Sequence, residues 1–108
     1  MELLNAQVLT SGMEKDREVD HAFTSDLMSD VLTGDYQKTV LVTGLSNLQA
    51  IRTAEMSDIQ DVIIGRGKEV SRELVDLAED NGISLMKCSY SLFRISGLLY
   101  KAGLTPLY

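Results

Sequence analysis

The stretch Thr39-Val40-Leu41-Val42-Thr43-Gly44 decides the fold that this sequence predicts. An unbroken run of β-branched and aliphatic residues is typical of a strand buried on both faces, as in a parallel or mixed sheet. The stretch Asp61-Val62-Ile63-Ile64-Gly65 repeats the pattern, and Ser84-Leu85-Met86-Lys87-Cys88 is a third predicted strand. A glycine after each of the first two runs indicates a turn into a loop.

Helical patterns alternate with these strands. Apolar residues recur at helical spacing in four segments, with a Ser or Asn as the candidate N-cap of each. These segments are Ser25–Leu32, Asn47–Met56, Ser71–Asn81 and Ser91–Ala102. Two earlier extended pieces, Ala6–Leu9 and Arg17–Phe23, are expected to form a hairpin-like antiparallel edge. The order β-β-α-β-α-β-α-β-α predicts a small three-layer α/β/α domain with a parallel or mixed sheet of four to five strands.

Composition limits the classes of function. The 108 residues, 44% of them hydrophobic, are expected to form a single domain over 1–108. Ten basic against sixteen acidic residues give a net charge of −6, which argues against nucleic-acid binding. No apolar run approaches a membrane span, so we expect no membrane partner and a cytoplasmic protein. One Cys and one His are too few for a thiolate cage or a two-imidazole site, and we expect no metal and no cofactor.

The order and spacing of several short segments resemble the DRTGG domain family from about Glu2 to Leu104. The segments that carry the resemblance are Asp16–Val19, Ser25–Leu32, the strand ending at Thr43-Gly44, Asn47, Val62–Gly67, Gly82–Leu85 and Gly97–Leu104. The resemblance implies a fold like the N-terminal domain of HPr kinase/phosphorylase. It also implies a regulatory or assembly role, as in CBS-containing pyrophosphatases and phosphotransacetylases. Asp16-Arg17 matches the Asp-Arg of the family motif, whereas Asp20-His21-Ala22 replaces its Thr-Gly-Gly.

Small and polar residues follow the predicted strands and form a candidate ligand site. Ligands of open α/β sheets collect at the carboxyl ends of the strands, where helix N-termini offer free N–H groups to anions. The candidate ligand-binding residues are Thr43, Gly44, Ser46, Asn47, Gly65, Arg66, Gly67 and Ser89. The alternative is that they are only helix caps and turn residues. Gly65-Arg66-Gly67 lacks the spacing of a dinucleotide-binding or P-loop motif.

Four more polar residues form a second candidate cluster, which corresponds to the family motif: Asp16, Arg17, Ser25 and Asp26. The cluster is either a ligand or partner site, or a local ion pair at the entry to a strand, which contributes little if exposed. We assign no catalytic residue. His21 lies in a predicted strand with no motif around it. Cys88 precedes a helix N-terminus, where a thiol pKa can fall, but a buried, inert cysteine is the alternative.

The final predicted helix has an apolar surface wider than one sheet can cover. On a helical wheel its apolar residues spread over roughly 220°, about twice the stripe that a sheet-covering helix needs. We therefore predict a homodimer interface at Leu92, Phe93, Ile95, Leu99 and Tyr100, with Gly97 allowing close approach. The alternative is that Leu3–Leu9 covers the excess.

The predicted function is a non-catalytic regulatory or protein-interaction module that self-associates as a homodimer. One alternative is a sensor that binds a small anionic ligand or a nucleotide at the strand-end loops. A second alternative is a small enzyme or phosphocarrier that uses Cys88 or His21.

Overall fold

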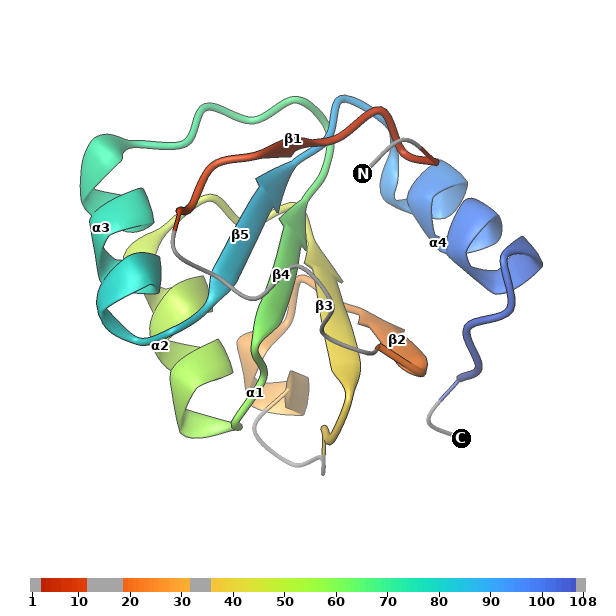
Figure 1. The fold of residues 1–108 in the computed structure, drawn as a ribbon, viewed down its shortest axis with the longest axis horizontal. Coiled ribbons are helices and arrows are strands. Elements are labelled where there is room, and N and C mark those ends of the chain that lie inside the picture. The colour runs from red at the N-terminus through yellow and green to blue at the C-terminus, as the bar shows by residue number, and fades with distance from the viewer. Residues whose placement is uncertain (1–2, 12–18, 32–35, 107–108) are drawn as a thin grey trace.

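A five-stranded mixed sheet forms the centre of the computed structural model, which describes residues 3–11, 19–31 and 36–106 (Figure 1). The strand order is β1-β5-β4-β3-β2. The strands are β1 (Gln7–Val8), β2 (His21–Thr24), β3 (Thr39–Thr43), β4 (Asp61–Ile64) and β5 (Ser84–Lys87). The last four run parallel, with Leu41 opposite Val62 and Val62 opposite Leu85. The predicted three-layer α/β domain is confirmed.

Alternation along the strands divides the core between the two faces of the sheet. Leu41 and Val62 pack on one face with α1 (Met28–Val31), α2 (Leu48–Met56) and α3 (Arg72–Asp80). Val42 and Ile63 point to the other face, where α4 (Leu92–Lys101) contacts β2 and β3. Among the helices that the structure describes, α1, α2 and α3 therefore cover one face and α4 covers the opposite face (Figure 1).

Side-chain caps begin three of the helices where the sequence places them. Asn47, Ser71 and Ser91 accept hydrogen bonds from the N–H groups of Ala50, Leu74 and Arg94 at 3.0, 3.1 and 3.1 Å. Ser25 differs from the expected N-cap. Its hydroxyl accepts from the N–H of Leu27, two residues on, at 3.0 Å, so it closes a turn before α1 rather than capping that helix.

The predicted hairpin at the start of the chain is wrong. β1 pairs antiparallel with β5, whereas β2 pairs parallel with β3 at the opposite edge of the sheet. Each βαβ crossover places the next strand beside the previous one, which leaves the outer side of β5 open to β1. β1 does supply the antiparallel edge that the sequence predicts.

The segment after α4 returns to the outer side of β2. The N–H of Thr105 donates to the carbonyl of Asp20 at 3.0 Å, and the N–H of Ala22 donates to the carbonyl of Thr105 at 3.3 Å. Pro106 follows and has no N–H to offer a further strand. In the part of the chain that the structure describes, no helix is both long and apolar enough to cross a membrane.

Candidate functional site

The loops that follow the four parallel strands meet at one edge of the sheet. Backbone hydrogen bonds connect them: Gly65 N–H donates to Thr43 at 2.9 Å, Arg66 to Tyr90 at 2.8 Å, and Gly67 to Cys88 at 3.0 Å. The loop after β4 is thereby held between the loops after β3 and β5. This placement follows from the parallel pairing, because the carboxyl ends of parallel strands share an edge.

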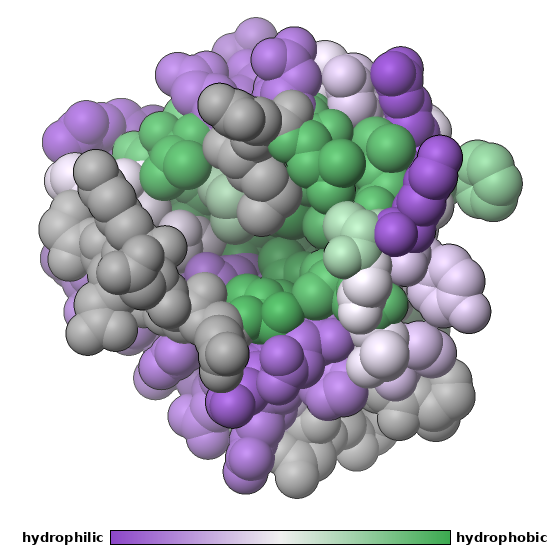
Figure 2. Space-filling view, turned by 45° about the vertical axis from the view of Figure 1, so that its right-hand side comes forward, coloured by the Kyte–Doolittle hydropathy of each residue, from purple (hydrophilic) through white to green (hydrophobic). Residues whose placement is uncertain are grey.

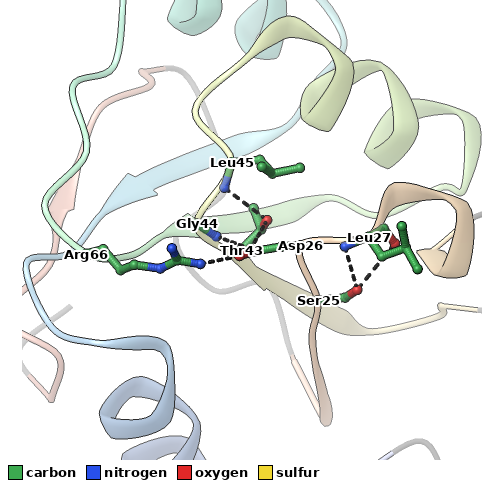
Figure 3. Close-up of polar contacts among 7 residues, drawn as sticks. All are labelled: Ser25, Asp26, Leu27, Thr43, Gly44, Leu45 and Arg66. Carbon is green, nitrogen blue, oxygen red and sulfur yellow. Dashed lines mark hydrogen bonds and ion pairs between the residues drawn. The ribbon is translucent and has the colours of Figure 1, made fainter.

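Asp26, in the loop after β2, is the centre of the polar contacts at this edge (Figure 3). One carboxylate oxygen accepts from the Gly44 N–H at 2.6 Å and from the Thr43 hydroxyl at 3.1 Å. The other oxygen is paired with the Arg66 guanidinium. The structure therefore joins one residue of the motif cluster to three of the predicted ligand-binding residues, which the sequence analysis treats as separate sites.

Gly44 makes room for the arginine. A Cβ at Gly44 would lie only 2.7 Å from Nε of Arg66, so the guanidinium occupies space that a side chain would otherwise fill. Arg66 has a φ of +65° and Gly67 a φ of +64°, two successive residues in the left-handed region. This turn carries the Arg66 side chain from the end of β4 across Gly44 to Asp26 (Figure 3).

The pKa of Asp26 lies below its ordinary value. Partial burial alone would raise the pKa, because it disfavours the charged form. The hydrogen bonds from Gly44 and Thr43 and the positive charge of Arg66 lower the pKa and outweigh that cost. The carboxylate is therefore ionised at neutral pH and neutralises Arg66, which is the nearby cation that an anionic ligand would use.

The other predicted ligand-binding residues have structural partners or lie beside the turn. Asn47 caps α2, and the hydroxyl of Ser46 donates to the carbonyl of Glu69. Ser89 lies next to Gly67, whose Cβ position would be 3.8 Å from the Cα of Ser89. Asp16 and Arg17 lie outside the described residues, so their share of the motif cluster stays a prediction.

A hollow of about 320 Å³ lies away from these loops. It lies between β2, α4 and the segment after α4, and its lining is mainly apolar. The lining residues are Ala22, Thr24, Phe93, Ser96, Gly97, Tyr100, Leu104, Thr105 and Pro106. None of the predicted ligand-binding residues belongs to it. That those residues line a concavity of their own stays a prediction.

The predicted interface residues of α4 divide between two sides of the helix. Phe93 and Tyr100 are 90% and 71% exposed, and both border the hollow. Ile95 and Leu99 are buried against the sheet with Leu4, and the half-buried Leu92 packs on the same cluster. Part of the apolar surface is thus covered by the start of the chain. The prediction that Ile95 and Leu99 belong to the interface is wrong, because both side chains are buried in the core. Figure 2, with the α4 side turned forward, shows that hydrophobic side chains gather on this face of the molecule.

The two candidate nucleophiles, Cys88 and His21, are both engaged in hydrogen bonds within the fold. The Cys88 thiol is buried and donates to the carbonyl of Leu4 at 3.1 Å. The Nδ1 of His21 is 2.7 Å from the Thr105 hydroxyl and ties the segment after α4 to β2. Among the residues that the structure describes, no three of His, Cys, Asp and Glu group as they would around a metal ion.

Comparisons with known proteins identify the fold. No family model and no curated protein matches the sequence. Among solved structures, the regulatory region of a Clostridium perfringens pyrophosphatase, comprising CBS and DRTGG domains in complex with the activator diadenosine tetraphosphate, matches with a TM-score of 0.75 at 15% identity. The match covers 96% of this chain and 47% of that one, so this chain spans about half the length of its neighbour. The chain has a DRTGG-like fold.

Proposed function

We propose that the chain is a non-catalytic regulatory or protein-interaction module that self-associates as a homodimer through the exposed side of α4. The observation that carries this proposal is Phe93, which is 90% exposed on α4 and borders an apolar hollow. An exposed ring that borders an apolar hollow forms a contiguous apolar patch, and such a patch is typical of a contact surface.

The surface has the properties that a two-fold contact needs. Phe93, Gly97 and Tyr100 follow one another at helical spacing and form a stripe with a gap at its centre. A Cβ at Gly97 would meet nothing within 4 Å, so another backbone has room to approach. A projecting ring and a hollow on the same surface are self-complementary, and closed two-fold symmetry is the commonest arrangement for such a surface.

Sedimentation equilibrium at micromolar concentration tests the dimer. The wild-type chain is expected at twice its chain mass, and Phe93→Ser at the mass of one chain with unchanged circular dichroism. Met56→Ser is the matched control, because Met56 is also an exposed apolar residue, at 69%, but lies at the end of α2. A monomeric wild type, or equal effects of the two variants, would refute the proposal.

A second candidate function is a sensor for a small anionic ligand at the strand-end loops. Arg66, Gly44 and Thr43 bring a guanidinium, an N–H group and a hydroxyl to one point, as an anion site requires. The neighbour of like fold is itself complexed with a nucleotide activator. A thermal-shift screen against nucleotides and phosphorylated metabolites tests this candidate, since a ligand of the native state raises its stability. A screen without any shift would count against a sensor.

Catalysis by Cys88 or His21 has less support. The Cys88 thiol contacts the Leu4 carbonyl, which cannot act as a base. The His21 imidazole contacts the Thr105 hydroxyl, and that hydroxyl is within hydrogen-bonding distance of the Asp20 carbonyl. We expect Cys88→Ser and His21→Ala to leave cellular function intact in a complementation assay. Loss of function with unchanged folding in either variant would favour the enzyme or phosphocarrier alternative.

A further inference from the structure

We propose that the strand-end loops form an anion site that the chain's own Asp26 carboxylate fills, and that a phosphate group binds there when Asp26 is displaced. The inference rests on the second candidate function, the anion sensor. It names phosphate as the class of ligand and the Asp26 carboxylate as the group that competes with it. It is independent of the dimer.

The groups around Asp26 are those of a site for a tetrahedral oxyanion. The Arg66 guanidinium supplies charge and planar donors, and the Gly44 N–H and the Thr43 hydroxyl supply two more donors. A carboxylate presents two oxygens to these three donor groups. A phosphate monoester presents three oxygens and up to two negative charges, and therefore matches the donors better.

The backbone that carries the donors is held by the central strands and the loop after β5, whereas Asp26 lies in a connecting segment. Thr43 is fully buried at the end of β3, and Gly44 follows it directly. The backbone of Arg66 is held by Tyr90 in the loop after β5. Asp26 lies between the edge strand β2 and α1, a helix of four residues. The carboxylate is thus carried by the less supported segment. The backbones of Thr43 and Arg66 keep their hydrogen bonds to Gly65 and Tyr90 when it leaves, and the part-exposed Arg66 side chain is then free to turn toward a phosphate.

The missing side chain at Gly44 is the second observation that favours a ligand. The space over this residue admits the guanidinium only because no Cβ is present. Close approach of a charged group to the backbone is the use that glycine has at anion sites. Any side chain at this position would push Arg66 away from both Asp26 and a phosphate.

A tethered carboxylate competes with free ligand at an effective concentration in the millimolar range. Wild-type affinity for a simple anion is therefore weak, and the full affinity of the donors becomes measurable once the competitor is removed. A ligand with further contacts can overcome the competition, and its binding then releases the junction between β2 and α1.

Isothermal titration calorimetry with inorganic phosphate, against sodium chloride at equal ionic strength, tests the proposal. Asp26→Ala is expected to bind phosphate with an apparent Kd lower than that of the wild type by about tenfold or more. The double variant Asp26→Ala/Arg66→Ala is expected to lose this gain. Asp76→Ala is the matched control, because it also removes one carboxylate from an Arg–Asp pair, the pair with Arg72 on α3.

Equal phosphate affinity in Asp26→Ala and Asp76→Ala would overturn the proposal. If Asp26→Ala does not fold in chloride, phosphate is expected to restore its circular dichroism, and failure of that rescue would also overturn it. The result separates the proposal from the sensor function. Phosphate binding by Asp26→Ala, without any wild-type ligand in the screen, leaves the site established and removes the sensor. If the wild type binds a ligand in the screen but Asp26→Ala gains no phosphate affinity, the sensor function is supported and the Asp26-filled phosphate site is refuted.

Discussion

Asp26 connects three strand ends although it belongs to none of the central strands. Its partners, Thr43, Gly44 and Arg66, lie 17, 18 and 40 positions along the chain. The sequence identifies all four as polar or turn residues near strand ends, but no local pattern shows that a carboxylate after β2 reaches the loop after β4. That contact depends on the left-handed turn at Arg66 and Gly67, and a φ above zero at an arginine has no sequence signal.

The stability that Asp26 contributes is expected to depend on pH. Its pKa is lowered in the folded state, so its contribution is present above the unfolded pKa of about 4 and is lost as the pH falls through the folded value. Asp26→Asn removes this dependence. Urea unfolding at a series of pH values below about 5 should show a smaller loss of stability for Asp26→Asn than for the wild type. Parallel curves for the two proteins would contradict the assignment.

A side chain at Gly65 is predicted to destabilise the protomer. A Cβ there would lie 2.8 Å from Cδ2 of Leu92 and 2.9 Å from Cδ1 of Ile95, both on α4. Gly65→Ala should therefore overpack the contact between the loop after β4 and α4, and lower the free energy of unfolding by about 1–3 kcal/mol. Urea unfolding in a Phe93→Ser background, which is expected to be monomeric, measures this without interference from association.

Gly97→Ala is the matched control for Gly65→Ala and a test of the interface in its own right. Gly97 lies inside α4, where an added methyl meets nothing within the protomer. Alanine should raise protomer stability by about 0.5–1 kcal/mol, because glycine is the poorer helix former. The same methyl should weaken the dimer. A variant with unchanged or tighter association would show that Gly97 lies outside the contact.

At the scale of elements, α4 has two sides with separable effects. Ile95 is fully buried against the sheet, so Ile95→Ala should lower the free energy of unfolding by about 2–5 kcal/mol. Phe93→Ala should leave protomer stability within about 0.5 kcal/mol of the wild type and abolish association. Chemical unfolding together with sedimentation distinguishes the two. Large destabilisation by Phe93→Ala would mean that its ring packs within the protomer.

The elements are predictable to different degrees, for physical reasons. The central strands and the helices α2, α3 and α4 are found from the sequence because long apolar runs, helical spacing and Ser or Asn caps are local signals. The partner of β1 is not found, because two residues carry no pairing information and the choice depends on which edge the crossovers leave open. A helical wheel of α4 gives the width of its apolar surface but does not show which part faces the sheet. For this reason the sequence places Ile95 and Leu99 in the interface and not in the core.

At the scale of the whole molecule, net charge opposes self-association. Each chain carries a net charge of −6. Two exposed basic residues, Arg94 and Lys101, lie on α4 itself. Two protomers therefore repel one another, while the proposed contact is apolar and unaffected by screening. Raising the ionic strength from about 10 mM to about 150 mM shortens the screening length from roughly 30 to 8 Å and should tighten the dimer. Sedimentation at the two salt concentrations measures this, and weaker association at high salt would indicate a contact made by ion pairs.

The outer sides of β5 and β2, the first and last of the four parallel strands, are paired with segments from opposite ends of the described chain. β1 pairs with β5 eighty positions away, and Thr105 pairs with His21 across a similar separation. The inner strands instead pair with neighbours one βα unit away, so their contacts require shorter loop closures. Under native conditions, amide hydrogens of Leu9 and Thr105 should exchange with deuterium long before those of β3 and β4. The sheet would then be completed during folding from its middle outward, with both rims added last and opened first.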